Sequence, residues 1–226
     1  MQAVRPLITR LTSLPIAGDD VFAATERMYD RLNGVRALLT DSARTSIRLV
    51  VNPERIVIAE ARRTATYLSL FGYGVDAVVA NRLLPDAVSD PWFKAWKEAH
   101  AEHLAAIEQG FAPLPVLRAD LAADEPVGAD RLRRLAGSLY GEIDPTEILH
   151  RGEPLRVERR GEDLVLRLGL PFAEPDELDV ARRDGELLVR VGPHRRAIML
   201  PDSLRRRSVG CATMAGPWLE VSFVDD

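Results

Sequence analysis

Side chains that could carry out phosphate chemistry are scarce in this sequence. Lys94 and Lys97 are the only lysines, and neither of them follows a glycine. A nucleotide-hydrolysing loop needs glycines whose backbone amides surround the phosphates, followed directly by a lysine that reaches them. The sequence also has no Gly-x-Ser-x-Gly turn, the nucleophile turn of one large class of acyl-transfer enzymes. We therefore predict no catalytic residue in this chain.

Metal and thiol chemistry have equally little support. His100, His103 and Glu108 share a predicted helix, but no further ligand motif accompanies them, so we expect no metal site. The simpler interpretation places His100 at the edge of the core and His103 in solvent. Cys211 is the only cysteine, which excludes an internal disulfide and a four-cysteine zinc site. The alternating residues around it predict that it is a small core residue.

Composition is typical of ordinary soluble globular proteins. Apolar residues make up 46% and charged residues 28% of the 226 positions, which excludes wholesale disorder and a membrane bundle. The formal net charge of -4 disfavours general nucleic-acid binding, although a local basic patch remains compatible with it. The longest apolar runs are strand-sized and no secretory signal is visible, so we expect a cytoplasmic protein without an integral membrane segment.

The elements that must position any site alternate between helix and strand in the first part of the chain. Residues 19–39 place apolar side chains three and four apart, which predicts an amphipathic helix. A β-branched run at 45–51 predicts a strand. The Asn-Pro-Glu sequence at 52–54 then favours a helix start, with Asn52 accepting from the free amides. That helix should end at a glycine, before a second strand at 75–80.

The alternation continues to about residue 140 and then changes. A further helix should begin at Asp90, a third apolar run lies at 114–117, and a last helix should end near Tyr140. Strand, helix and strand at this spacing form a right-handed parallel unit. We therefore predict an α/β domain with three parallel strands and flanking helices at 1–142, a linker at 143–153, and a second domain at 154–226.

The second domain is predicted to be all-β. Its apolar residues alternate with period two in several short runs. Asp184-Gly185 is a tight-turn dipeptide between two of these runs. Alternating runs separated by turns are typical of an antiparallel β-sandwich.

Five blocks of the first part form an ordered series: MYDRLNGVRALLTD at 28–41, TSIRLVVNPE at 45–54, IAEARR at 58–63, VVANRLLP at 78–85 and EPVG at 125–128. In order and spacing these blocks resemble the ArsA family of anion-pump ATPases and its relatives that target tail-anchored membrane proteins. The likeness covers about residues 10–141 and implies an incomplete P-loop NTPase fold. The tail is similar to the α-crystallin domain of small heat-shock proteins, through DLVLRLGLP at 163–171, ELDV at 177–180, DGELLVR at 184–190 and ATMAGPWL at 212–219.

This resemblance implies ATP and Mg²⁺ as cofactors at the level of the family. The family's phosphate-binding loop and both of its switch segments lie upstream of the part matched here. The chain alone is therefore expected to bind ATP and Mg²⁺ poorly and to be inactive as an ATPase. The cysteine pairs that hold zinc or arsenite in relatives are also missing, so no metalloid role is implied.

The resemblance also assigns an adenine side of the nucleotide site. The family asparagine that ends the strand before the Arg-Leu-Leu-Pro block corresponds to Asn81, with Arg82 beside it, and the second adenine-side loop falls near Asp120. An amide suits this role because it donates and accepts at once. The alternative is that Asn81 simply caps the turn after its strand.

The resemblance also implies a surface that binds a partner protein. In the tail-anchor relatives, helices that match about 19–39 and 90–110 form an apolar groove for hydrophobic clients. Trp92, Phe93 and Trp96 fall in the second of these helices, although such a stripe also suits an ordinary core. Our first hypothesis is the C-terminal part of an ATP-driven dimeric switch. The alternative is a nucleotide-independent, chaperone-like adapter that binds clients.

A parallel sheet of only three strands should leave an edge exposed. Parallel sheets usually have both faces buried, and an uncovered edge strand attracts another chain. We therefore expect the isolated chain to self-associate, or to pair with an upstream half that bears the phosphate-binding loop.

Overall fold

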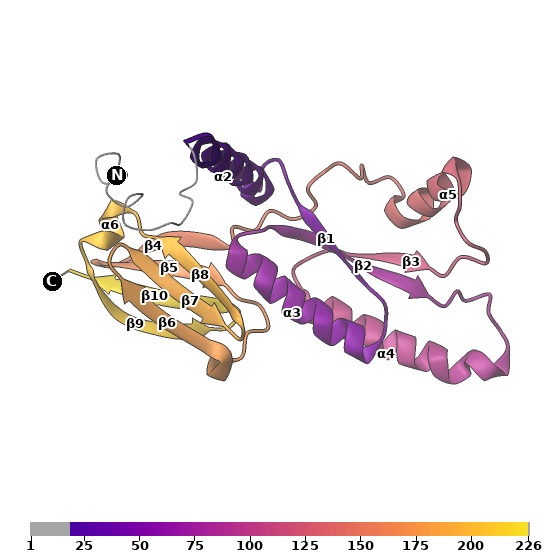
Figure 1. The fold of residues 1–226 in the computed structure, drawn as a ribbon. Coiled ribbons are helices and arrows are strands. Elements are labelled where there is room, and N and C mark those ends of the chain that lie inside the picture. The colour runs from indigo at the N-terminus through magenta and orange to yellow at the C-terminus, as the bar shows by residue number, and fades with distance from the viewer. Residues whose placement is uncertain (1–18, 226) are drawn as a thin grey trace, which may run out of the picture. The chain divides into compact units, whose positions relative to one another are not determined.

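The computed structural model describes residues 19–225 (Figure 1). The chain forms two compact units, Met1–Leu39 and Thr40–Asp226. The described element of the first unit is helix α2 (Asp19–Thr40), which confirms the helix predicted at 19–39. In the part of the chain that is described, no helix has the length and apolar character needed to cross a bilayer.

The second unit begins with a parallel sheet in the order β1-β2-β3, which confirms the three predicted parallel strands. Its strands and helices are β1 (Ile47–Val51), α3 (Arg55–Phe71), β2 (Val75–Leu83), η1 (Pro91–Phe93), α4 (Lys94–Gly110), β3 (Val116–Asp120) and α5 (Ala129–Tyr140). Figure 1 shows α3 and α4 on the same side of this sheet. The third strand begins two residues later than the apolar run at 114–117 and extends to Asp120.

The two faces of the parallel sheet are covered unequally. One face contributes Leu49, Val51, Val78 and Ala80 to a core that it shares with α3 and α4. The opposite face has a smaller cluster of Val79, Leu117 and Ala119, packed against Leu139 and Tyr140 of α5. On the edge strand β1, Val50 is 62% exposed. The second face is therefore only partly covered by the described residues of this unit.

The ends of α3 differ in how well the sequence predicted them. The helix begins at Arg55 with Glu54 as its N-cap, and no side chain caps it, so the capping role predicted for Asn52 is wrong. The Asn52 side chain instead accepts a hydrogen bond from Asn81. At the other end, Gly72 adopts a left-handed φ of 87° and its N–H bonds to the Ser69 carbonyl, as a glycine C-cap should.

The tail is an antiparallel sandwich, as predicted. One sheet has the order β4-β5-β10-β9 and the other β6-β7-β8. The elements are β4 (Leu155–Arg160), β5 (Asp163–Gly169), η2 (Pro175–Glu177), β6 (Leu178–Arg183), β7 (Glu186–Val191), β8 (His194–Met199), α6 (Asp202–Arg205), β9 (Ser208–Ala215) and β10 (Trp218–Val224). Asp184, with φ of 51°, forms the predicted turn between β6 and β7. Alternate residues of both sheets meet in one core, which includes Leu166, Val189 and Phe223.

Helix α3 belongs to both cores. Its first half buries Ile58 and Ala61 against the parallel sheet, whereas Leu70 near its end is fully buried in the sandwich core. The Ser69 hydroxyl donates to the Gly169 carbonyl of β5 at 2.5 Å. The sandwich is thus packed onto the α/β part rather than only tethered to it.

The segment between α5 and β4 is also fixed to the sheet. Asp76 of β2 is 1% exposed and pairs with Arg48 of β1 at 3.4 Å. The same carboxylate accepts from the Leu149 N–H at 3.0 Å, while Arg48 donates to the carbonyls of Pro145 and Glu147. Burial lowers the pKa of Arg48, but its hydrogen bonds to Tyr140 and Asp76 outweigh that effect and raise it. These bonds hold the segment against the amino ends of the parallel strands.

Candidate functional site

Two asparagines meet at the carboxyl ends of neighbouring parallel strands. Asn52 directly follows β1, Asn81 follows Ala80 in β2, and Val51 and Ala80 are register partners. The Asn81 side-chain N–H donates to the Asn52 side-chain oxygen at 3.2 Å, and both residues are half-buried. This bond leaves the Asn81 carbonyl oxygen, the second N–H of Asn81 and both N–H groups of Asn52 for other partners. Ligands of open α/β sheets bind outside the carboxyl ends of the strands, which is where this pair lies.

The backbone beside Asn81 is irregular. Arg82 is exposed and has a left-handed φ of 59°, which costs a non-glycine residue roughly 1 kcal/mol. The register between β2 and β3 shifts between Ala80 and Leu83, so the bulge falls on Asn81 and Arg82. Bulges of this kind redirect side chains and are common beside functional sites. No pattern in the sequence predicted this bulge.

Asp120 lies at the carboxyl end of β3, beside a separate hollow. That hollow has a volume of about 220 Å³ and is lined by Asp120, Pro126, Arg131 and Arg134, among others. Arg131 pairs with Asp124 at 2.8 Å and donates to the Glu125 carbonyl. Asn81 and Arg82 are not among the lining residues of this hollow. Asn81 and Asp120 therefore share the carboxyl edge of the sheet, and this hollow adjoins Asp120 but not Asn81.

Comparison with known proteins identifies the family. Residues 1–141 match the model of the anion-transporting ATPases, and residues 152–223 match the HSP20-like domain found in ArsA. The chain belongs to the ArsA family of anion-transporting ATPases. A putative arsenical pump-driving ATPase of Prosthecochloris vibrioformis is 34% identical over 97% of this chain and 56% of its own length. One from Aquifex aeolicus is 34% identical over 91% of this chain and 53% of its own length.

Other relatives carry less informative names. An uncharacterized protein of Streptomyces coelicolor is 32% identical over 100% of this chain and 56% of its own length. The ArsA-family chain therefore spans about half the length of the curated relatives that it matches.

Two histidines of α4 hold the loops at the carboxyl edge of the ArsA-family chain. His103 Nδ1 lies 2.7 Å from the Pro53 carbonyl, so this half-buried side chain is not the solvated one that the sequence predicted. The Leu84 N–H donates to His100 Nδ1 at 3.4 Å. Burial, reinforced by the nearby His103, lowers the pKa of His100 despite the opposing charge of Glu54. No group of three histidine, cysteine or acidic side chains within residues 19–225 is placed to hold a metal ion.

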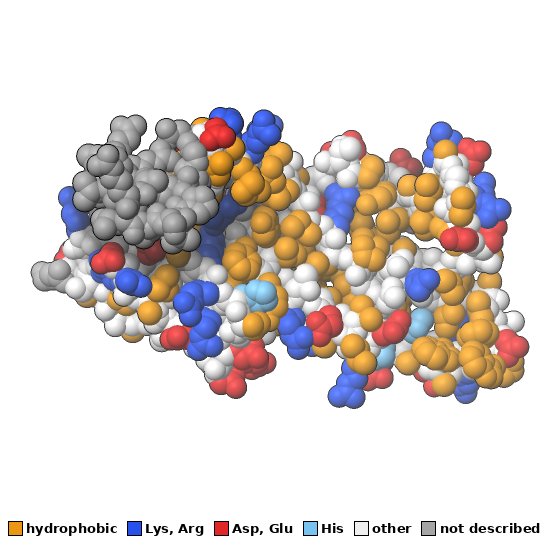
Figure 2. All heavy atoms as spheres, viewed as in Figure 1, with side chains coloured by type: hydrophobic (Ala, Val, Ile, Leu, Met, Phe, Trp, Pro, Cys, Tyr) orange, Lys and Arg blue, Asp and Glu red, His pale blue; other side chains and the backbone are white. Residues whose placement is uncertain are grey.

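Of the proposed partner residues, Trp92 and Phe93 lie in η1 and Trp96 lies in the first turn of α4; both tryptophans are exposed and Phe93 is half-buried. Trp92 is 70% and Trp96 is 50% exposed, and the Trp92 ring meets Phe93 edge-on at 4.8 Å. Asp90 fixes this corner by accepting from the Trp92 N–H at 2.8 Å. Only the later part of α4, at Ile107, is fully buried in the core. Hydrophobic side chains gather at the lower right of Figure 2, where α4 begins in the same view in Figure 1.

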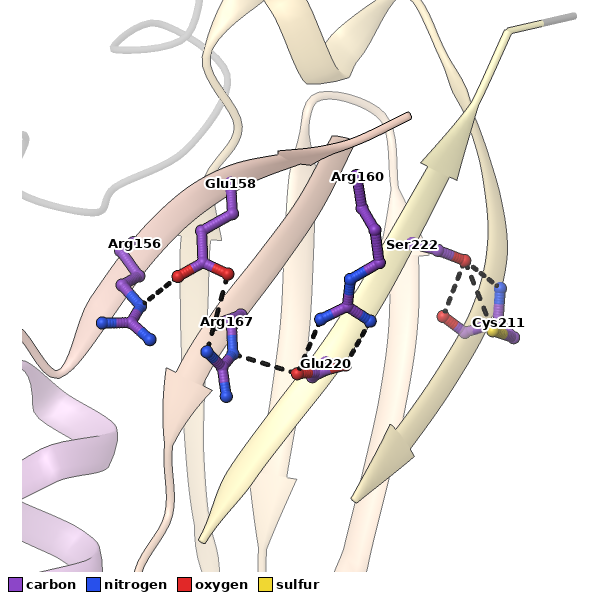
Figure 3. Close-up of polar contacts among 7 residues, drawn as sticks. All are labelled: Arg156, Glu158, Arg160, Arg167, Cys211, Glu220 and Ser222. Atoms are coloured by element: carbon purple, nitrogen blue, oxygen red, sulfur yellow. Dashed lines mark hydrogen bonds and ion pairs between the residues drawn. The ribbon is translucent and has the colours of Figure 1, made fainter. Parts of the chain in front are cut away.

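The HSP20-like domain carries a paired polar network on the outer face of its larger sheet (Figure 3). Glu220 of β10 pairs with Arg160 at 2.9 Å and with Arg167 at 3.0 Å, and Arg156 pairs with Glu158 at 2.7 Å. The hydrogen bond from Arg160 holds the pKa of Glu220 below its usual range. Three arginines share two glutamates in this network, so most of its charge is paired within the sheet and one positive charge is left in excess.

Cys211 lies on the same outer face and is exposed, which corrects the prediction of a core residue. Its sulfur is 3.3 Å from the Ser222 hydroxyl on the adjacent strand (Figure 3). The predicted alternation placed Cys211 on the inner face of its strand. Its side chain is on the outer face because β9 has a register irregularity against β10 opposite Val221 to Phe223. A shift of one residue exchanges the two faces of a strand.

Proposed function

We propose that this chain forms the base-side half of an ATP site, in a dimeric switch whose phosphate-binding loop is supplied by residues outside these 226. The observation that supports the proposal is the Asn52 and Asn81 amide pair at the carboxyl ends of β1 and β2. The adenine edge offers a donor and an acceptor side by side, and a side-chain amide matches both. Because the chain belongs to a family of ATPases, the nucleotide that we expect at this site is ATP.

The residues of the chain fit the base better than the phosphates. Asn81 and Arg82 would approach the base from β2, and Asp120 would approach it from β3. No lysine follows a glycine in the sequence, and no acidic cluster in the described part could hold Mg²⁺. Bound ATP and Mg²⁺ would supply the phosphoryl chemistry. This chain would orient the base and present the helical surface of α4 to a partner.

Side-chain amide signals in nuclear magnetic resonance (NMR) spectra test this proposal directly. The chain has only three asparagines, Asn33, Asn52 and Asn81, so each NH₂ pair can be assigned by substitution. We expect adenosine and ATP to shift the Asn52 and Asn81 pairs with similar, millimolar affinity, because the base alone is recognised. The Asn33 pair on α2 should stay in place.

The control variant and the contradicting results follow from the same spectra. Asn81→Asp removes the amide donor and should weaken adenosine binding about tenfold, the effect of one hydrogen bond to a base edge. Asn33→Asp makes the same chemical change on α2 and should leave binding intact. Shifts confined to Asn33, or an unchanged affinity in Asn81→Asp, would refute the base-side assignment. So would phosphate release from ATP in proportion to the amount of pure chain.

The exposure of Trp92 and Trp96 favours a second candidate, a client-binding adapter that needs no nucleotide. Exposed aromatic side chains at the start of a helix are common in surfaces that receive apolar segments. Suppression of the aggregation of an unfolded model protein distinguishes the two candidates. Suppression without nucleotide that Trp92→Ser abolishes favours the adapter, whereas dependence on ATP favours the switch.

A further inference from the structure

An apolar pocket of the second unit lies between its α/β part and the sandwich, away from both sites discussed above. Its volume is about 340 Å³. The walls come from the end of α3 and the loop that follows it, the loop after α4, the segment before β4, the segment after β5 and the first residue of β10. Four aromatic rings line it, those of Tyr73, Phe111, Phe172 and Trp218.

The size of the pocket defines the size of its ligand. A dry apolar cavity of about 150 Å³ accommodates one benzene ring. A volume of about 340 Å³ therefore suits a molecule with two aromatic rings. Several prolines complete the walls, including Pro113, Pro154 and Pro171, so most of the lining offers shape and apolar contact rather than hydrogen bonds.

The few polar groups of the pocket define the chemistry of the ligand. Ser69 also lines it, but its hydroxyl already donates to the Gly169 carbonyl. His150 and Glu153 line it from the segment before β4. Glu153 is exposed, so its carboxylate can accept an O–H or N–H of a ligand from the solvent side of the pocket and disfavours an anion there.

The walls are held in place before any ligand binds. A Cβ at Gly169 would lie 3.3 Å from the Ser69 hydroxyl and 3.4 Å from the Trp218 ring, so glycine lets helix and strand approach this closely. The guanidinium groups of Arg156 and Arg167 each lie 4.8 Å from the centre of the Trp218 ring. A preorganised site of this kind loses little entropy when a rigid ligand enters it.

We propose that this pocket binds a small, uncharged molecule with two aromatic rings and one hydrogen-bond donor. Such a ligand contacts the end of α3 and the sandwich at the same time, and its binding stabilises their docking. The proposal does not depend on nucleotide binding, because no residue of the carboxyl edge of the parallel sheet lines the pocket.

Titration with 2-naphthol, followed through the indole N–H signals, tests the proposal. The chain has three tryptophans, Trp92, Trp96 and Trp218, and only Trp218 lines the pocket. We expect a saturable shift of the Trp218 signal with a dissociation constant of about 0.1 mM, typical of a ligand with eleven heavy atoms. The Trp92 and Trp96 signals should not move. No saturable shift of Trp218, or equal shifts of all three signals, would overturn the proposal.

Two comparisons sharpen the test. Gly152 lines the pocket, is exposed and has no left-handed φ, and a Cβ there would lie 3.2 Å from Nε2 of the His150 side chain. A small rotation of that imidazole accommodates Gly152→Phe, whose ring should occupy the mouth and weaken 2-naphthol at least tenfold. Gly137→Phe adds the same ring in open space on α5 and should not change binding. Replacing 2-naphthol by 2-methoxynaphthalene removes the donor and should weaken binding about tenfold. Equal binding by both glycine variants would place the ligand elsewhere, and equal binding of the two probes would refute the selection by Glu153.

Discussion

At the scale of single residues, the carboxyl edge of the parallel sheet is organised by side chains that bond to loops. The Asn52 and Asn81 amides bond to each other, while His100 and His103 of α4 bond to the loops after β2 and β1. These four residues set the positions of the loops from which the proposed base contacts would be made. They make the carboxyl edge sensitive to protonation, because His100 must stay neutral to accept the Leu84 N–H.

Acid should destabilise the chain through His100. Its pKa is lowered in the folded state, so as the pH falls below about 6.5 the unfolded chain takes up this proton more readily than the folded chain does. The free energy of unfolding contributed by this group is therefore fully present above that pH and is lost progressively below it. In His100→Gln, urea denaturation should show a smaller loss of stability between pH 7 and pH 5 than in the natural chain.

The same titration contains its own control. Between pH 8 and pH 9 the imidazole is neutral in both states, so the stability difference between variant and natural chain should be constant there. If the two pH profiles ran parallel down to pH 5, the assignment of the acid sensitivity to His100 would be wrong.

At the scale of elements, α3 is the part that joins the two cores. Its first turns pack on the parallel sheet and its last turns complete the sandwich, where Leu70, Tyr67 and Phe71 contact the core. His194 of β8 lies 4.0 Å from the Tyr67 ring, and Arg196 donates to the Leu70 carbonyl at 2.5 Å. A helix that begins beside the carboxyl end of β1 thus ends inside the HSP20-like domain.

Truncating Leu70 should therefore destabilise the sandwich, although the residue lies outside it in sequence. Leu70→Ala leaves a cavity in the sandwich core and should lower the free energy of unfolding by about 2–4 kcal/mol. Amide hydrogen exchange of β7 and β10 should show the loss, because those strands line the same core. Ile56→Ala truncates a 79% exposed residue of the same helix and should change stability by less than about 0.5 kcal/mol. Unchanged protection of both strands in Leu70→Ala would show that α3 is not part of the sandwich core.

At the scale of the whole molecule, the parallel sheet ends at β1, and among the described residues only β2 pairs with that strand. The curated relatives are about twice as long as the part that this chain spans. The proposed switch needs further strands and a phosphate-binding loop, and the β1 edge is the place where such strands would add.

The β1 edge should make the isolated chain self-associate. A lysine on an edge strand opposes pairing with another chain, so Val50→Lys should increase the monomer fraction in a concentration series of sedimentation velocity runs. Val127→Lys adds the same charge at a 67% exposed position outside the strands and should leave association as it is in the natural chain. If the natural chain were monomeric at every concentration, the β1 edge would not mediate self-association.

The sequence by itself determined the elements of the fold, because hydrophobic period and turn residues are local. The parallel strands, the glycine that ends α3 and the Asp184 turn were all predicted, and the family followed from ordered blocks such as VVANRLLP. The tertiary structure alone decided which side chains meet. It paired Asn52 with Asn81, exposed Cys211 and buried Leu70 in the sandwich. These outcomes depend on strand register, bulges and contacts between residues far apart in sequence, and none of them leaves a periodic signal that a single chain could reveal.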